Sequence, residues 1–326
     1  MTNKTILVTG GSGFIGTNLV AALEALGHDI VNLDIKPPLD PKQRRFWRAC
    51  DLLEEERIRA VLGDCQPSAI VHLAARTDTD GDELEYYAAN HRGTANLLAA
   101  ARDLVPGLDR LVLTSTQFVV GPGAPPANDL DFRPHTVYGQ SKVLTEKLLR
   151  ESDPAYTWTI VRPTNVWGPW HPRYPNEFWR IVKRGLYFHP GDMRVMRTYG
   201  YVGNVVDQII NILAARRELV DKAVFYLGDA PIPLLDWVNA FCRELTGRPA
   251  RIVPTGVVRV TALAGDVAKA VGLPAPIFSS RFRSMTQNYV TPMEPTFAAF
   301  GSPPIPMQEG VSQTVRWLRT QDSFWN

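Results

Sequence analysis

The sequence predicts an α/β protein in which a doubly wound parallel sheet carries helices on both faces, with a smaller, irregular α/β domain beside it. Three observations lead to this expectation. Runs rich in Val, Ile and Leu alternate with helical patterns through the first half of the chain, as in buried parallel strands. A glycine-rich turn at 9–16 joins the first run to the first helix. After about residue 163 the alternation ends, and Pro, Trp and Arg become frequent.

The expected elements follow from apolar runs and helical periodicity. Gly27 and Gly247 stand where helices would end in a left-handed residue. Strands are expected at 6–8, 30–33, 69–73, 110–114 and 157–161, and helices at 15–26, 54–62, 84–104, 136–151 and 234–245.

The expected domain division follows the change in sequence pattern after about residue 163. Residues 1–169 and about 199–229 are expected to form the sheet domain, and about 170–198 and 230–326 the smaller one. Proline occurs 11 times from Pro231 onward, which restricts that part of the chain to turns and extended pieces. Only the helix at 234–245 is recognisable there.

Composition excludes several function classes. The 326 residues include 35 Lys+Arg and 33 Asp+Glu, so a formal charge of +2 argues against binding nucleic acid through a general field. Three separated cysteines form neither a disulfide framework nor a zinc site, and no metal is expected. No leader and no apolar run of about 20 residues is found. We therefore expect a soluble, cytoplasmic protein with no membrane partner.

The turn at 9–16 is suited to a pyrophosphate. Its glycines, spaced three apart, allow a tight turn and close approach of the main chain, and the following helix offers its N-terminus. An acidic residue, Asp34, ends the second strand 18 residues later, where a ribose-binding carboxylate is expected and where it disfavours a 2′-phosphate. The pattern predicts a Rossmann-like NAD site with these residues from the turn: Gly10, Gly13, Phe14, Ile15 and Gly16.

A phenol and an amine follow at helical spacing. Tyr138 and Lys142 are four residues apart and share a helix face. Lys142 can stabilise the phenolate of Tyr138, which then serves as a base near neutral pH. Thr116 comes directly after the strand 110–114, where it can orient a substrate hydroxyl or carbonyl. Together these three side chains predict a proton-transfer site.

These motifs together resemble the extended short-chain dehydrogenase/reductase family, the group of NAD-dependent sugar epimerases and dehydratases. The resemblance covers the domain plan of nearly the whole chain and, in motif detail, about residues 5–207. It rests on residues 9–16, 34, 51–52, 72–75, 90–98, 114–121, 138, 142 and 162–169.

The resemblance implies roles for further residues. Thr116, Tyr138 and Lys142 would be the catalytic triad, and Tyr138 and Lys142 would also contact the cofactor, Lys142 at the nicotinamide ribose. The remaining cofactor contacts would come from Asp51, Leu52, Leu73, Ala74, Ala75 and Asn90, the last either near the cofactor or supporting the central strands. Dimers of the family pair the two long helices, and a homodimer is expected through the apolar faces of 84–104 and 136–151.

The resemblance also narrows the reaction. Family dehydratases carry an Asp-Glu pair after the catalytic Thr, decarboxylases a Glu and 3,5-epimerases a Cys. This chain has Gln117 and Phe118 there, neither of which can transfer a proton. A 4-epimerase, which returns hydride to the opposite face of a keto-sugar, or a net dehydrogenase/reductase remains.

A nucleotide-diphosphate sugar is the expected substrate. Arginine outnumbers lysine 27 to 8, and six basic residues against two acidic ones fall within 173–197. Arg197 matches the family's diphosphate-binding Arg. Asn165 matches the residue holding a phosphate or sugar, and Gln117 and Arg281 are further substrate candidates. Asn204 stands where Asp is usual.

Two other classes remain open. The tail at 289–317 resembles family members that oxidise sterols at C3, although sugar-acting members share it. Aromatic residues could line a sterol slot, or they could be core: Trp158, Trp167, Trp170, Phe178, Trp179 and Phe188. A non-catalytic NAD-binding protein is least favoured, because both Tyr138 and Lys142 are present.

Overall fold

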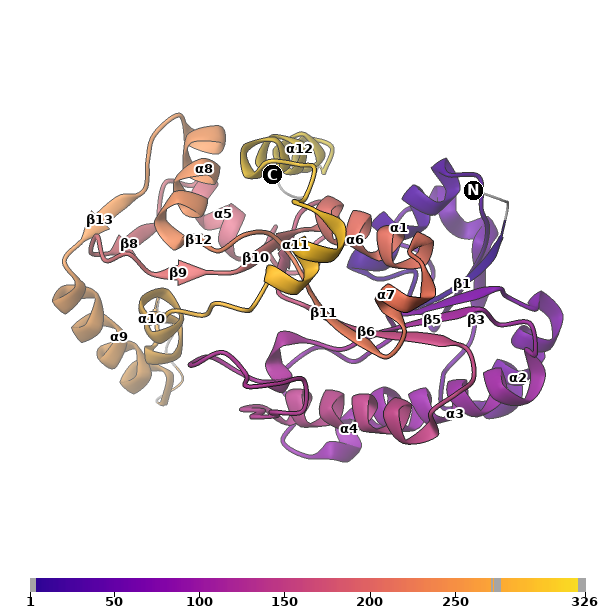
Figure 1. The fold of residues 1–326 in the computed structure, drawn as a ribbon. Coiled ribbons are helices and arrows are strands. Elements are labelled where there is room, and N and C mark those ends of the chain that lie inside the picture. Colours follow the sequence, from indigo (N-terminus) through magenta and orange to yellow (C-terminus); the bar gives the residue numbers. More distant parts are fainter. Residues whose placement is uncertain (1–3, 271, 273–276, 322–326) are drawn as a thin grey trace. The chain divides into compact units, whose positions relative to one another are not determined.

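The computed structural model describes residues 4–270, 272 and 277–321, and the chain divides into two compact units (Figure 1). The first consists of Met1–Trp170, Gly200–Asp229 and Thr291–Pro304. The second consists of His171–Tyr199, Ala230–Val290 and Ile305–Asn326.

The first unit is built on a seven-stranded parallel sheet with the order β11-β6-β5-β4-β1-β2-β3. Two of its strands, β3 and β11, were not anticipated from the sequence. The strands are β1 (Thr5–Thr9), β2 (Asp29–Asp34), β3 (Trp47–Ala49), β4 (Ala69–His72), β5 (Arg110–Thr114), β6 (Thr157–Pro163) and β11 (Ala223–Leu227).

Helices flank this sheet on both faces, with α1 and α6 on one and α2, α3 and α4 on the other (Figure 1). The helices of the unit are α1 (Phe14–Ala25), α2 (Glu55–Cys65), α3 (Ala88–Leu104), α4 (Val137–Ser152), α6 (Val202–Ala214), α7 (Arg217–Val220) and α11 (Glu294–Phe300), with 3-10 turns η1 (Pro41–Phe46), η2 (Leu84–Tyr87) and η3 (Gln117–Val119). The predicted doubly wound α/β fold is therefore confirmed.

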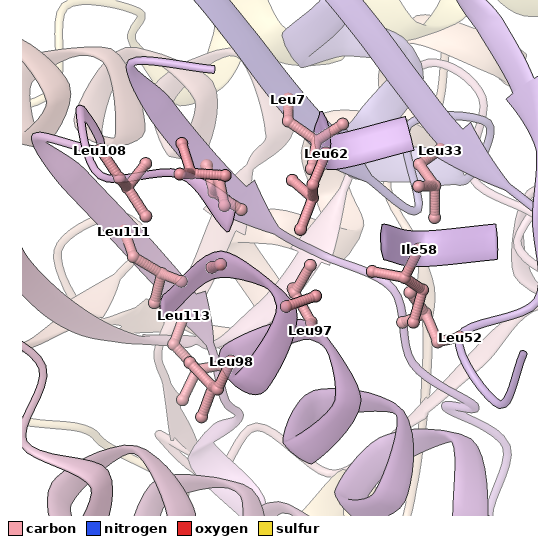
Figure 2. Packing of buried hydrophobic residues seen from close by; sticks show 14 of the residues in the cluster. Leu7, Leu33, Leu52, Ile58, Leu62, Leu97, Leu98, Leu108, Leu111 and Leu113 are labelled. Atoms are coloured by element: carbon pink, nitrogen blue, oxygen red, sulfur yellow. The ribbon is translucent and has the colours of Figure 1, made fainter. Parts of the chain in front are cut away.

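Leucine and isoleucine from the sheet and from α2 and α3 form the main core beneath one face (Figure 2). Leu7, Ile58, Leu62 and Leu97 are fully buried in it. Because parallel strands need apolar residues on both faces, this packing explains why the strand sequences read as continuous apolar runs.

The sheet order places a switch point between β1 and β4, from which the chain winds in opposite directions. Thr9 is in register with Leu33 of β2 and with His72 of β4. The carboxyl ends of these strands therefore meet at one edge, where ligands of such sheets bind.

Residues 291–304, expected in the second domain, belong to the first unit. The hydroxyl of Thr296 donates to the carbonyl of Tyr226 at 2.7 Å, and the Phe300 ring lies 5.0 Å from that of Phe225. These contacts attach α11 to strand β11, which is remote in sequence.

The second unit is more regular than the sequence suggested. Two of its proline residues precede helices, where proline is tolerated: Pro233 before α8 and Pro306 before α12. Its helices are α5 (Phe178–Lys183), α8 (Leu234–Thr246), α9 (Thr255–Ala270), α10 (Ser279–Thr286) and α12 (Met307–Arg319).

Short strands complete the two units. In the second, β8 (Phe188–Pro190) pairs with β13 (Arg251–Val253), and β9 (Met196–Arg197) pairs with β12 (Ile232–Pro233). β7 (Asn165–Trp167) of the first unit pairs with β10 (Tyr199–Tyr201), where the chain crosses between units.

Candidate functional site

The turn between β1 and α1 leaves no room for a side chain at Gly10 or Gly16. Gly10 has φ +69°, and a Cβ on it would lie 2.6 Å from the main-chain nitrogen of Ala74. A Cβ on Gly16 would collide with the carbonyl of Gly10. Helix α1 begins after Gly13 without a side-chain cap, so its N-terminus is open to an anionic ligand. The geometry fits a pyrophosphate lying against the main chain.

Asp34 stands beside this turn at the end of β2. Its carboxylate accepts the amides of Ser12 at 3.1 Å and Lys36 at 3.0 Å. Burial raises the pKa of Asp34, and these hydrogen bonds work against that rise. The half-buried carboxylate is therefore fixed at the position expected for ribose recognition.

The other residues expected to contact the dinucleotide differ in how far their side chains are buried. Asp51 is half-buried, and its carboxylate accepts the amide of Leu53 at 2.9 Å. Leu52 packs into the main core, so a ligand contact from it would come from its main chain. Leu73, Ala74 and Ala75 follow β4 and are half-buried beside the glycine turn. Phe14 and Ile15 are half-buried in the first turn of α1.

Asn90 has a supporting position. Its side chain is fully buried, donates to the carbonyl of Arg76 at 3.0 Å and accepts the amide of Arg76 at 2.7 Å. It also donates to the Ser141 hydroxyl at 2.9 Å, and that hydroxyl donates to the carbonyl of Tyr138 at 2.7 Å. Of the two roles expected for Asn90, this geometry favours support: the residue ties the loop after β4 to the start of α4.

The structure brings Thr116 and Tyr138 together. The Thr116 hydroxyl accepts the amide of Phe118 at 3.3 Å and hydrogen-bonds the phenol of Tyr138. Burial raises the pKa of Tyr138 to about 12, and the hydrogen bond from Thr116 opposes the rise. The phenol therefore needs nearby positive charge before it can act as a base.

Lys142 stands one turn further along α4. It is 1% exposed, and burial lowers its pKa to about 8, while the carboxylate of Glu146 opposes the fall. Glu146 is itself buried and forms a two-pronged ion pair with Arg162 at 2.9 and 2.8 Å. This ion pair was not predicted from the sequence, although Glu146 repeats the four-residue spacing of Tyr138 and Lys142.

Aromatic side chains surround the phenol. The rings of Tyr87 and Phe118 each lie 6.1 Å from that of Tyr138. The hydroxyl of Tyr87, another residue missed from the sequence, donates to the carbonyl of Asp78 at 3.0 Å. His135 lies 5.2 Å from the Phe118 ring, and burial lowers its pKa. Gln117 is buried after Thr116.

In the second unit, Arg197 is a buried cation. It is 7% exposed; its guanidinium donates to the carbonyl of Ser284 and lies 6.0 Å from the Tyr289 ring. Its Nε has no hydrogen-bond partner, and no carboxylate pairs with it among the described residues. Burial lowers its pKa, as expected for a charge removed from water without a counter-ion. An anionic ligand would supply that counter-ion.

The other substrate candidates are placed differently. Arg281 is exposed on α10. Burial raises the pKa of Tyr174 to about 12, and the charges of Arg173, Arg197 and Arg281 work against that rise, which places Arg197 and Arg281 near the same ring. Asn165 is half-buried on β7 of the first unit.

Two features are absent from the described residues. These residues contain no group of three or more His, Cys, Asp or Glu arranged to hold a metal ion. None of their helices has the length and apolar character required to cross a bilayer.

Comparison with known proteins gives one family and several relatives. The model of the NAD dependent epimerase/dehydratase family matches residues 6–228. The human sterol-4-alpha-carboxylate 3-dehydrogenase, decarboxylating, is 28% identical over 258 residues, which span 75% of this chain and 66% of that enzyme, just under two thirds of its length. The UDP-glucose 4-epimerase of Vibrio cholerae is 29% identical over 222 residues, covering 64% of this chain and 66% of that one.

A solved structure shares the fold. The UDP-glucose 4-epimerase of Thermotoga maritima, crystallised with UDP-glucose, has a TM-score of 0.74 at 21% identity, covering 97% of this chain and 98% of that chain. At this identity the likeness shows the fold alone.

Proposed function

We propose that this chain, which belongs to the NAD-dependent epimerase/dehydratase family, is a nucleotide-sugar 4-epimerase. NAD is the family's cofactor, and its oxidised nicotinamide supplies the acceptor for a substrate hydride. The glycine turn with Gly10, Gly13 and Gly16 would hold the pyrophosphate, and Asp34 the adenosine ribose.

In the proposed chemistry, Tyr138 takes the proton of the sugar C4 hydroxyl as that carbon loses hydride. Thr116 orients the hydroxyl, and Lys142 stabilises the phenolate by its charge. The resulting keto-sugar then regains hydride on its other face, and Tyr138 returns the proton. Dehydrogenation or reduction of the same substrate would use the same residues without the return step.

The residues after Thr116 support this choice over elimination. Expelling a hydroxyl or decarboxylating a sugar acid requires a further proton-transfer group. Gln117 has none, and Phe118 presents an apolar ring 6.1 Å from that of Tyr138.

The observation that carries the substrate class is Arg197. A buried guanidinium without a carboxylate is costly unless a ligand anion pairs with it. A nucleotide-sugar diphosphate would do so through charge-assisted hydrogen bonds, whereas a neutral sterol would leave the charge unpaired.

The test is a thermal-shift screen in the presence of NAD, with UDP-, GDP-, CDP- and dTDP-sugars and a sterol. A ligand that binds the folded chain raises its melting temperature by mass action. Replacing Arg197 by Ala should weaken nucleotide-sugar binding by about 1.5–3 kcal/mol, that is, about 10-fold to 150-fold. Chromatography of the products separates the 4-epimer from a ketone released together with NADH.

The matched control is Arg243→Ala, which removes an exposed arginine of the same unit. Its affinity for the nucleotide sugar should equal that of the wild type. A nucleotide sugar bound equally well by the Arg197 variant, or a shift with the sterol alone, would refute the proposal.

A sterol-type 3-hydroxy dehydrogenase is the second candidate, because the human relative carries that name at 28% identity. Such an enzyme would keep Tyr138, Lys142 and Thr116 in the same roles. It predicts NADH formation with a 3-hydroxysterol and no response to nucleotide sugars.

A cytoplasmic homodimer completes the proposal. Three free cysteines, two of them buried, suit a reducing compartment. The dimer rests on the family resemblance alone. On the expected helix 84–104, the apolar residues Leu97, Leu98 and Ala101 are buried in the core of the unit itself. Light scattering in solution tests it.

A further inference from the structure

Helix α9 exposes an unusual apolar face. Val257, Val260, Leu263 and Val267, spaced three or four residues apart, lie along one side and are 56%, 68%, 54% and 67% exposed. Next to the helix start, Ile252 is 54% exposed. A water-facing helix surface normally carries polar residues, so this stripe suits a different environment.

The stripe is not the face by which α9 packs in its own unit. The opposite side, with Val258 and Ala262, is buried against Ile277 in a small core. Figure 1 shows α9 and α10 side by side. The helix is therefore apolar on two sides, and its own unit uses only one.

Few charged groups interrupt the outer face. Asp266 accepts the amide of Ser279 at 3.1 Å, and Lys269 lies 5.4 Å from the ring of Phe278, so both contact the segment that leads into α10. Arg259, exposed on α9, flanks the stripe.

The sequence that contains the stripe is strongly basic. From 248 to 283 the sequence contains one acidic residue, Asp266, and six basic residues, all of them exposed: Arg248, Arg251, Arg259, Lys269, Arg281 and Arg283. Pairing of this face with the same face of a second copy would bring like charges together. An apolar stripe with basic flanks instead matches a bilayer surface, whose anionic headgroups lie above an apolar interior.

We infer that α9 lies on anionic phospholipid membranes, with Val257, Val260, Leu263 and Val267 entering the headgroup–acyl boundary and the flanking basic residues contacting lipid phosphates. No membrane partner was expected from the sequence, which contains no apolar run long enough to span a bilayer. Adsorption through one amphipathic helix face does not require such a run.

The experiment is vesicle flotation of the full chain without NAD or sugar, so that its result is independent of the proposed activity. We expect the protein to float with vesicles of phosphatidylcholine and phosphatidylserine, less at high salt, and not with phosphatidylcholine alone. Val260→Asp with Val267→Asp should abolish flotation. Arg259→Gln should weaken partitioning about fivefold.

Leu130→Asp is the matched control, because it places the same charge on another side chain that is 62% exposed, in the first unit. It should float as the wild type does. Since Val260 and Val267 are mostly exposed, the double variant should melt as the wild type does, so that lost flotation reports lost contact. Flotation unaffected by the double variant, or absent from phosphatidylserine vesicles, would overturn the inference. So would a dimer in light scattering that the double variant dissociates, which would assign the face to a second copy.

Discussion

At the scale of single residues, burial shifts the pKa values of the two ionisable side chains of the candidate site, and a few specific contacts oppose those shifts. Burial raises the pKa of Tyr138 to about 12 and lowers that of Lys142 to about 8. Both shifts favour the neutral side chains, whereas the proposed chemistry needs the phenolate beside the ammonium. These two forms of the pair contain the same number of protons, so the reactive form becomes available once the pair has lost one proton.

A pH profile follows from this coupling. Because the first proton leaves the pair near the pKa of Lys142, kcat/KM should rise with pH up to about pH 8 and then level off. Glu146→Gln removes a negative charge that raises the pKa of Lys142, so the rising limb should move to lower pH. Steady-state kinetics at saturating NAD measure both profiles.

Two controls accompany this profile. Tyr138→Phe should eliminate turnover while NAD still binds. A rising limb that stays at the same pH in the Glu146 variant would show that this carboxylate does not tune the site. The variant keeps an acceptor for Arg162, whose buried guanidinium otherwise loses its partner.

At the scale of elements, the connection from β1 to α1 is the most constrained segment of the site. Gly10 and Gly27 stand at the two ends of the turn–helix segment, both with positive φ, +69° and +79°. The two glycines differ in the room available for a side chain. A Cβ on Gly10 would collide with the main chain of Ala74, whereas a Cβ on Gly27 would have no atom within 4 Å.

These two glycines make a matched pair of variants. Gly27→Ala should cost about 1–2 kcal/mol of unfolding free energy, the strain of a left-handed alanine. Gly10→Ala should cost more, because the main chain must also shift, and it should weaken NAD binding, which Gly27→Ala should leave unchanged. Urea unfolding and an NAD titration provide the measurements. Equal losses of stability in the two variants would contradict the close approach of Gly10 to Ala74.

The elements predicted correctly from the sequence are those whose pattern is local. The strands at the switch point were expected from apolar runs and helix α4 from helical spacing. The structure adds that the Thr136 side chain accepts the amide of Gly139 as the N-cap of α4. The expected helix at 84–104 begins instead with the 3-10 turn η2, because Tyr87 is tied to the preceding loop through Asp78. The helices α9 and α12 were missed, since proline residues nearby indicated irregular chain.

At the scale of the whole molecule, each unit buries a neutral histidine. In the first, His72 is hydrogen-bonded on both ring nitrogens, to Thr9 at 2.6 Å and to Thr94 at 2.9 Å. In the second, His171 stacks on Tyr174 with ring centroids 3.9 Å apart. Burial lowers the pKa of each to about 3.

Stability should therefore depend on pH through these groups. The folded pKa lies below the unfolded value near 6.5, so the unfolded chain binds a proton that the folded chain refuses, and stability is lost as pH falls from about 6.5 toward 3. His72→Gln removes one such group and should make the unfolding free energy less steep by up to about 1.4 kcal/mol per pH unit between pH 6 and 4. Urea unfolding at several pH values measures this slope.

The informative quantity is the difference in pH slope between the wild type and the His72→Gln variant. Burial raises the pKa of Asp229 to about 6, which acts with the opposite sign in the same pH range, but it does so in wild type and variant alike. Equal slopes in the two would mean that His72 is protonated in the folded chain.

The sequence alone determined the glycine turn, the carboxylate of Asp34 and the spacing of Tyr138 and Lys142. Each depends on residues a few positions apart or on the end of a recognisable strand, and such local geometry follows from strand and helix periodicity. Tertiary structure decided the attachment of α11 to the first unit, the pairing of Glu146 with Arg162, the burial of Arg197 without a carboxylate and the exposure of the stripe on α9. Each of these features depends on which residues, distant in the chain, surround a side chain and exclude water from it. The periodicity within one helix or strand does not specify those neighbours.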